Sequence, residues 1–497
     1  MRRRGQISTM AIVFLIVGII IGAVIGYFLK PAPVGVVSEE EYNKLLAENE
    51  QLKKKVEELT KQLEAAGPAA PTEITITVWA IGPDEPSVYR FEAFKVAAEK
   101  LNKMLEDLGS PTRVKIEGDF WTQSWGDYKK RFLMAMEAGK GPDIYCTGHE
   151  DVATHAEAGY IIPLDDYIQE YWDVVYFDII PTLWDAVRYK GKLWAIPQDT
   201  EARPLYFRKD ILKKLGWTDA EIEELPKKIE NGEFTIDDMV ALAKEAVDAG
   251  LVEYGLVHRC SPGWDYQQFY LAYGGRLWDP DTGKLVFTKS AWKKFLELFE
   301  RMRDEGVVDP NQFGSEWKTA FHERFTQGRA LFASGGTWHK AEWIKKYGIT
   351  EEYFWENIGF ALHPAGEKGG KPVTLSHPLV YMITKTCKNP DVAFLLITLV
   401  TDPTINSLHA VHSAHLAILN SQITNTKYVE DRFLAEVAYM LKYTTFIPLH
   451  PKYGLYNEMI FRAVSAVESG AASAEEAFDV FLSEVQDTLG DEVIIEE

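Results

Sequence analysis

The sequence has few cysteines, and none has a spacing typical of a metal cluster. Cys146, Cys260 and Cys387 are far apart, odd in number and outside any CxxC motif. They permit at most one disulfide, and buried free thiols are the simpler expectation. No cysteine follows the apolar run near the N-terminus, so lipid attachment at that point is excluded.

Basic residues are outnumbered, and several enzyme signatures are missing. The chain has 53 basic and 74 acidic side chains, which gives a formal charge of −21. Such a surface repels phosphate backbones, so nucleic acid is not expected as a partner. There is no Walker loop, GxSxG motif or catalytic-cysteine arrangement, and residues 321–325 contain HE without HExxH. These absences remove common signals of NTPases, hydrolases and zinc proteases, and no cofactor is predicted.

Three histidines are spaced three apart, at His409, His412 and His415. On a helix, positions i, i+3 and i+6 drift round the surface, so ligation of one metal by all three would be strained. The neighbouring alanines and leucines favour a half-buried helix end. We therefore predict no metal site.

One long apolar run is present, at residues 10–29, directly after three arginines. A helix of about 20 residues, at roughly 1.5 Å per residue, spans the roughly 30 Å hydrocarbon core of a bilayer. The run has no clear cleavage site after it, and the arginines favour a cytoplasmic N-terminus. Residues 1–30 are thus predicted to be a retained single-pass anchor in the cell membrane, with the rest of the chain outside the cell.

Arg4-Gly5-Gln6 stands immediately before this region. It resembles the class III, pilin-like signal peptides of archaea. The resemblance implies cleavage between Gly5 and Gln6, which would leave the apolar helix on the mature chain. An ordinary uncleaved anchor with a chance Gly-Gln pair stays open.

A heptad pattern follows between residues 38 and 66. Leu45, Leu52 and Leu59 occupy d positions and Asn49 an a position. Leucine at d with one buried asparagine favours a parallel two-stranded coiled coil. We predict a stalk that pairs two chains as a parallel homodimer. A trimer, or a lone solvated helix, stays open because three heptads are marginal.

Residues 67–71 break the helix and form a short stiff linker. Beyond them the chain alternates β-rich runs with helical stretches, and its 46% hydrophobic content allows ample cores. This order predicts an α/β fold whose ligands lie at the carboxyl ends of the strands. The expected elements are strands over 74–78, 113–117 and 143–145 and helices over 91–108 and 128–138.

Aromatic and acidic residues gather after these three strands. The chain has 14 tryptophans and 23 tyrosines. A neutral polyol offers hydroxyls and C–H faces, which ionised carboxylates and aromatic rings bind well. The alternative to ligand binding is that each ring packs in the core and each acid lies on the solvated surface. The candidates for ligand binding are Trp79, Asp84, Trp121, Trp125, His149 and Glu150.

An ordered set of motifs runs through the rest of the chain. The motifs occupy residues 141–144, 158–165, 189–197, 205–210, 325–338, 388–393 and 470–484. Taken in this order, they resemble those of family 1 extracellular solute-binding proteins, the maltose-binding-protein-like sugar receptors of ABC importers. The resemblance covers the chain from about residue 72 to the C-terminus.

The resemblance implies a two-lobed periplasmic-binding-protein-like fold, with two parallel or mixed sheets joined by hinges. The first lobe would comprise residues 72–197 and 378–420, and the second residues 201–374 and 422–497. Ligand would bind between the lobes and close them together.

The resemblance also implies functions for single residues. Glu150, Glu201 and Asp84 would accept hydrogen bonds from sugar hydroxyls, and Trp338 would stack on a sugar ring. Thr147 stands where maltose-binding relatives have an aromatic residue, which puts maltose itself in doubt. Further candidates are Trp264 and Tyr266, for which an ordinary core position is equally open, and Tyr456, which lies near the family's last stacking position.

The expected function is that of an anchored extracellular receptor, not an enzyme. It would capture a sugar or oligosaccharide and deliver it to the permease subunits of an ABC importer. Two alternatives stay open. One is a surface glycoside hydrolase that uses Glu150 and Glu201 as paired carboxylates. The other is a receptor for a non-sugar ligand such as a peptide.

Overall fold

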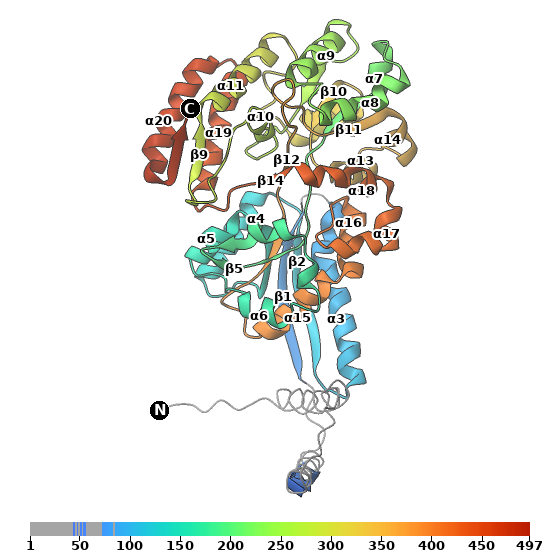
Figure 1. Ribbon diagram of the computed structural model, residues 1–497, viewed down its shortest axis with the longest axis vertical. Coiled ribbons are helices and arrows are strands. Elements are labelled where there is room, and N and C mark those ends of the chain that lie inside the picture. The colour runs from blue at the N-terminus through green and yellow to red at the C-terminus, as the bar shows by residue number, and fades with distance from the viewer. Residues whose placement is uncertain (1–42, 45–46, 48–49, 52, 56–71, 83–84) are drawn as a thin grey trace. The chain divides into compact units, whose positions relative to one another are not determined.

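The computed structural model describes residues 43–44, 47, 50–51, 53–55, 72–82 and 85–497 (Figure 1). The predicted anchor, the linker, most of the stalk and Asp84 lie outside the described residues. The chain divides into two units, residues 1–70 and residues 71–497, and the second unit holds nearly all that is described. Within the described part, no single helix is long and apolar enough to cross a membrane.

The first lobe of the second unit is built on a five-stranded sheet in the order β2-β1-β3-β13-β6. β1 runs parallel to β2 and β3, whereas β13 is antiparallel to both β3 and β6. β1 is rich in β-branched residues, and four of its side chains are fully buried. The strands are β1 (Glu73–Ile81), β2 (Arg113–Trp121), β3 (Ile144–Gly148), β6 (Ile196–Pro197) and β13 (Leu379–Ile383).

The second lobe contains a four-stranded mixed sheet in the order β11-β7-β10-β8. β10 is parallel to β8 and antiparallel to β7. One continuous apolar core extends from Ala202 to Leu489 and includes residues between Ala410 and Ala417. The strands are β7 (Leu205–Arg208), β8 (Tyr254–Val257), β10 (Ala330–Ser334) and β11 (Ile358–Ala361).

Helices flank both sheets, and local sequence explains several of their starts. Thr218, Thr235 and Ser473 each form a capping box with an acid three residues later. Around the first sheet lie α3 (Tyr89–Asp107), α4 (Trp125–Glu137), α5 (Asp151–Glu157), α6 (Asp165–Glu170), α15 (Pro390–Thr401) and α16 (Pro403–Ser413). Later in the chain come α17 (Thr426–Glu430) and α18 (Arg432–Val437). The second lobe carries α7 (Lys209–Lys214), α8 (Asp219–Glu230), α9 (Ile236–Asp248), α10 (Gln267–Ala272), α11 (Lys289–Asp304), α12 (Arg324–Thr326), α13 (His339–Lys346), α14 (Glu351–Asn357), α19 (Tyr453–Glu468) and α20 (Ala474–Leu489).

The chain passes between the two sheets where β6 leads to β7 and where β12 (Thr374–Ser376) leads to β13. β12 pairs in parallel with β14 (Thr444–Phe446), so a segment after α16 joins the same region. Figure 1 shows β12 and β14 in the middle of the body, between the two groups of helices. The smaller strands elsewhere are β4 (Arg188–Tyr189), β5 (Lys192–Leu193), β9 (Leu285–Thr288) and β15 (Val493–Glu496).

A candidate ligand site between the lobes

Glu150 and His377 form the centre of the candidate site. Glu150 follows β3, His377 lies between β12 and β13, and Glu150 Oε2 is 2.6 Å from His377 Nε2. Lys129 of α4 donates to Glu150 Oε1 at 2.7 Å. Burial would raise the pKa of Glu150, but His377 and Lys129 outweigh it and hold that pKa well below its usual range. Glu150 is thus a buried, ionised acceptor.

Gly148 makes this pairing possible. A Cβ atom on Gly148 would lie 2.1 Å from Glu150 Oε2 and 2.3 Å from His377 Nε2. Any other residue at the end of β3 would therefore push the carboxylate and the imidazole apart. The two side chains thus lie directly against the backbone of Gly148.

Aromatic rings from both lobes flank His377. The ring of Trp125, at the start of α4, lies 6.3 Å from the His377 ring. Trp264, from the second lobe, lies 5.6 Å away on the same histidine and stacks on Tyr453. Trp125 and Trp264 are both partly exposed. An ionised acid and two accessible rings thus meet at one place, contributed by both lobes.

His149 lies beside this pair and is completely buried. Its Nε2 is 3.0 Å from the Ile447 carbonyl, which can only accept, so Nε2 carries the proton. Its Nδ1 is buried without a hydrogen-bond partner. Burial and the neighbouring His377 lower the pKa of His149 to about 4, so the ring is neutral at neutral pH.

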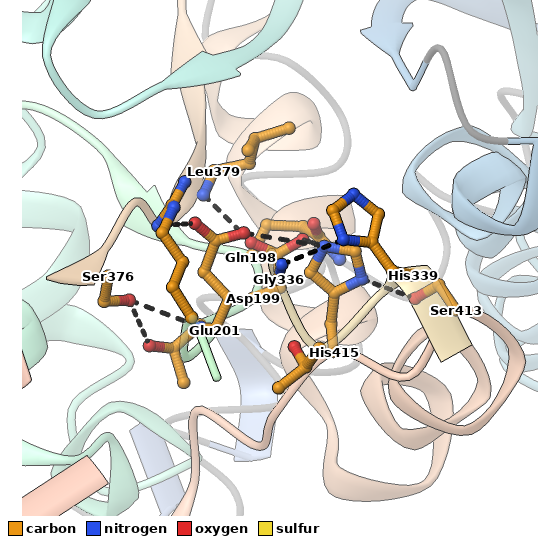
Figure 2. Close-up of polar contacts among 12 residues, drawn as sticks. Gln198, Asp199, Glu201, Gly336, His339, Ser376, Leu379, Ser413 and His415 are labelled. Carbon is orange, nitrogen blue, oxygen red and sulfur yellow. Dashed lines mark hydrogen bonds and ion pairs between the residues drawn. The ribbon is translucent and has the colours of Figure 1, made fainter. Parts of the chain in front are cut away.

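Glu201 lies on the connection from β6 to β7. Its backbone N–H donates to Ser376 Oγ at 3.3 Å, a contact visible in Figure 2. Its carboxylate forms an ion pair with Arg203 and lies 3.9 Å from His415 Nε2. Burial raises the pKa of Glu201 to about 7, although Arg203 and His377 oppose the rise. Glu201 can therefore exchange a proton near neutral pH.

Arg203 extends this network into the second lobe. Its Nε donates to Asp265 Oδ1 at 3.0 Å, and Arg259 contacts the other oxygen of Asp265 at 3.1 Å. Burial raises the pKa of Asp265, but the two arginines outweigh it and lower that pKa to about 2. The guanidinium of Arg203 also lies 5.3 Å from the ring centroid of Trp338.

Asp199 links the first lobe to the connecting segments. It accepts from Arg90 Nη2 at 2.9 Å, from the Leu379 backbone N–H at 2.9 Å and from His409 Nε2 at 2.9 Å. Figure 2 shows Asp199 and Glu201 on the same stretch of chain, with His415 beside them. Burial raises the pKa of Asp199, but Arg90 and His415 outweigh it and hold that pKa well below its usual range.

The three spaced histidines do not share one site. His409 and His415 face Asp199, whereas His412 contacts the Pro86 carbonyl at 2.7 Å and the amine of Lys345. The helical spacing does not apply to His415, because α16 ends at Ser413 and the left-handed backbone of Ala414 turns His415 back toward Asp199.

Trp338 lies between Arg203 and the end of α16. Its ring stacks on His415, with ring centroids 5.7 Å apart and an interplanar angle of 13°. It also covers Gly336, where a Cβ atom would lie 2.0 Å from the indole. The ring is partly exposed.

Four other predicted residues contact neighbouring side chains or lie in the core. Trp79 and Trp121 both contact the guanidinium of Arg131, at 3.8 and 5.2 Å from their ring centroids. Tyr266 and Tyr456 are fully buried in the core of the second lobe. Tyr456 accepts from Trp292 and donates to the Val286 carbonyl, so its hydroxyl is already used.

Sequence reasoning missed His377, Asp199, Arg90 and Arg203. The partners of Asp199 lie 109, 180 and 210 positions away in the sequence. The one local signal is that Gln198-Asp199-Thr200-Glu201-Ala202-Arg203 places three charged residues in six positions between two apolar strands.

Comparisons with known proteins agree on the fold. A family model described as bacterial extracellular solute-binding protein matches residues 91–406. The chain is 23% identical over 339 residues to a maltotriose-binding protein of Pyrococcus abyssi, covering 66% of each chain. It is 26% identical over 198 residues to a mannitol-binding protein of Pseudomonas aeruginosa, covering 39% of this chain and 40% of that one. The chain thus spans less than two thirds of the length of either relative.

Solved structures match over a larger share. An ABC transporter solute-binding protein of Thermotoga lettingae, bound to α-D-tagatose, has a TM-score of 0.66 and 21% identity; the match covers 84% of this chain and all of that one. The GacH receptor of Streptomyces glaucescens has a TM-score of 0.67 and 18% identity, with 84% and 99% covered. The predicted two-lobed, mixed α/β architecture is thereby confirmed.

Proposed function

The chain belongs to the bacterial extracellular solute-binding protein family, and from that premise we propose that it captures a carbohydrate between its two lobes. It would then deliver the ligand, chemically unchanged, to the permease subunits of an ABC importer. Its relatives include a maltotriose-binding protein and a mannitol-binding protein, which supports a polyhydroxylated ligand.

The observation that carries this proposal is the Glu150–His377 pair between Trp125 and Trp264. An ionised carboxylate makes the strongest hydrogen bonds available to a neutral hydroxyl. Aromatic rings cover the C–H face of a sugar and lose little rotamer freedom on binding. We assign Glu201 and Trp338 to the same proposed site. The Glu201 backbone contacts Ser376, the neighbour of His377, and Trp338 stacks on His415, which lies 3.9 Å from the Glu201 carboxylate.

Closure of the lobes would bring this site together. Trp125 comes from the first lobe, Trp264 from the second, and His377 from the segment that joins them. A second contact between the lobes lies on α13 and α16, where Lys345 meets His412. We propose the lobe boundaries given above, 72–197 with 378–420 and 201–374 with 422–497, as the bodies that move about these connections.

We further propose that residues 1–30 anchor the receptor in the membrane and that residues 38–66 pair two chains. The support is the apolar run and the heptad pattern of the sequence. N-terminal sequencing of the native protein tests the processing. A start at Gln6 supports cleavage, and a start at Met1 removes it. A strictly monomeric stalk in chemical crosslinking would remove the dimer.

A thermal-shift screen followed by calorimetry tests the main proposal. The panel would contain maltotriose, maltose, mannotriose, mannitol, tagatose and a short neutral peptide. A ligand present at about 100 times its Kd stabilises the folded state by about 2.7 kcal/mol, so a true ligand raises the melting temperature clearly. A response to a carbohydrate supports the proposal, and a response to the peptide alone contradicts it.

A glycoside hydrolase is the second candidate. The observation in its favour is that Glu150 is held ionised while the pKa of Glu201 is raised to about 7, a division of acid and base that hydrolases use. Chromatography of an oligosaccharide after prolonged incubation with the protein separates the two functions. A receptor returns the oligosaccharide intact, whereas a hydrolase releases shorter products.

A further inference from the structure

Three clusters among the described residues bring two histidines and an acid together. In each cluster the possible ligand atoms lie within 4.8 Å of one another. What distinguishes them is which ring nitrogens carry a proton, because a metal binds the lone pair of a deprotonated nitrogen. The clusters are Asp199 with His409 and His415, His322 with His339 and Glu342, and His149 with Glu150 and His377.

In the first cluster an arginine occupies the histidine lone pair that a metal would need. The Arg90 guanidinium donates to Asp199 at 2.9 Å and lies 3.0 Å from His415 Nε2. Because arginine can only donate, it takes the lone pair of His415 that a metal would need. This cluster is an ion-pair network and not a metal site.

In the second cluster the ring nitrogens that face a possible metal carry protons. His322 Nδ1 accepts from the Trp343 indole N–H at 2.9 Å, and His339 Nδ1 accepts from the Gly336 backbone N–H at 3.0 Å. Each neutral ring must therefore carry its proton on Nε2. Both Nε2 atoms are buried and without hydrogen-bond partners. They are donors, so this cluster suits an oxygen acceptor such as water.

In the third cluster His149 offers a buried lone pair, and only His377, whose Nε2 donates to Glu150, must free that nitrogen before a metal binds. His149 Nε2 donates to the Ile447 carbonyl at 3.0 Å, which leaves the lone pair on Nδ1. That Nδ1 is buried and has no hydrogen-bond partner. Metal-binding histidines are typically oriented in this way, by a carbonyl that holds the opposite ring nitrogen.

The acid in this cluster is supported in the same manner. Lys129 holds Glu150 Oε1 at 2.7 Å, while Oε2 faces His377 Nε2 at 2.6 Å. Ligating carboxylates usually have such an outer hydrogen bond. Because Gly148 has no Cβ, both ligand atoms can sit directly over the backbone.

We propose that His149 Nδ1, Glu150 Oε2 and His377 Nε2 form a site for one divalent transition metal ion, of which zinc fits best. Two imidazoles and one carboxylate are a zinc ligand set, with water or a ligand oxygen as the fourth ligand. The metal would replace the hydrogen bond between Glu150 and His377. His377 would bind the metal through Nε2 as a neutral imidazole that carries its proton on Nδ1.

This inference goes beyond the proposed function and does not depend on it. A carbohydrate can bind Glu150 and the flanking rings without a metal, and a metal can bind the three side chains without a carbohydrate. The two are therefore measured separately on the same protein, after treatment with a chelator and its removal.

The experiment is a calorimetric titration of zinc chloride into the chelator-treated full chain. We expect one zinc ion per chain. Cobalt(II) should give the intense visible absorption of a four-coordinate complex. His149→Asn and His377→Asn should each weaken zinc binding by more than about 100-fold, because loss of an outer-shell partner alone costs about 10- to 100-fold. Glu150→Gln should weaken it as well.

The matched control is His450→Asn, which removes a buried histidine outside the cluster and should leave zinc binding unchanged. Circular dichroism of every variant checks that it folds. The proposal is overturned if the wild type binds no zinc stoichiometrically, or if folded His149→Asn and His377→Asn proteins bind it like the wild type. Carbohydrate binding by the chelator-treated wild type decides the proposed function independently. If sugar binds and zinc does not, only the metal site fails.

Discussion

Glu150 and His377 are 227 positions apart in the sequence, yet Glu150 Oε2 and His377 Nε2 lie 2.6 Å apart over Gly148. This contact joins the end of β3 to the segment between β12 and β13. It places an ionised carboxylate where the two lobes meet, and the proposed binding site is organised around it.

Gly148→Ala should disrupt this contact. The new Cβ would lie 2.1 Å from Glu150 Oε2, so the carboxylate and His377 must separate. Overpacking of this kind typically costs about 1–3 kcal/mol of stability, and carbohydrate affinity should fall with it. Chemical denaturation and calorimetry measure the two effects.

The control is Gly454→Ala, at a glycine with nothing within 4 Å of its ideal Cβ position. That substitution lies in helix α19 and should be neutral or slightly stabilising. Equal losses of affinity in the two variants would contradict the importance given to Gly148.

Trp264→Ala should weaken carbohydrate binding. The ring lies over His377 and stacks on Tyr453 at the lobe junction, so its removal takes away the proposed stacking face. Cutting back a central aromatic anchor of this kind costs about 2 kcal/mol or more, which is roughly a 30-fold loss of affinity.

Trp172→Ala serves as the comparison, because Trp172 is 38% exposed and stacks on Trp184 away from the Glu150–His377 pair. We expect its calorimetric Kd to match the wild type. A Trp264→Ala protein that binds as tightly as Trp172→Ala would exclude Trp264 from the site.

Glu201→Gln should alter how stability depends on pH. Burial raises the folded-state pKa of Glu201 from 4.5 to about 7. Between these values the folded protein holds a proton that the unfolded chain has lost, so this group's contribution to stability is largest below pH 4.5. As the pH rises to 7 and above, this contribution to the free energy of unfolding decreases by at most about 3 kcal/mol in total.

The melting temperature of Glu201→Gln minus that of the wild type should therefore increase as the pH rises from 5 to 8. The difference between the two proteins isolates Glu201, since His149 and the other buried groups titrate in both. A constant difference across that range would show that the carboxyl is not held protonated by its surroundings.

Asp199→Asn should destabilise the junction of the lobes. Asp199 accepts from Arg90 and His409 while almost completely buried. Removing one partner of a buried ion pair leaves an uncompensated charge and costs about 3–5 kcal/mol. Urea unfolding should report this loss directly.

Glu92→Gln provides the matched comparison, because the Lys95–Glu92 pair is exposed. An exposed pair contributes about 0–1 kcal/mol, so this substitution should change the unfolding midpoint very little. If both substitutions shift the unfolding midpoint equally, Asp199 has no special part in holding the lobes.

Local patterns predicted much of the fold. The β-branched run of residues 74–78 lies within β1, as expected. The helix expected over residues 91–108 matches α3 to within two residues at each end. The order of the family motifs predicted the two-lobed architecture, which the comparisons confirm. These features depend on periodicity and composition, which a sequence displays directly.

The site was harder to predict, because its contacts join distant positions. Glu150 follows a recognisable strand, but nothing near it in the chain indicates His377. Trp79 and Trp121 fitted the expected pattern of rings after strands, yet both rings pack on Arg131. Whether an aromatic ring faces a ligand or a neighbouring side chain is decided by tertiary packing, which one sequence does not show.

The central claim is most directly tested by a calorimetric titration of the best carbohydrate from the panel into the full chain and into Glu150→Gln. We expect saturable binding of one ligand per chain, and a loss of about 10- to 100-fold in Glu150→Gln, since hydrogen bonds to charged groups contribute about 1.5–3 kcal/mol. Glu117→Gln, on the exposed part of β2, should bind like the wild type. No heat with any carbohydrate, or equal affinity in Glu150→Gln and Glu117→Gln, would contradict the account.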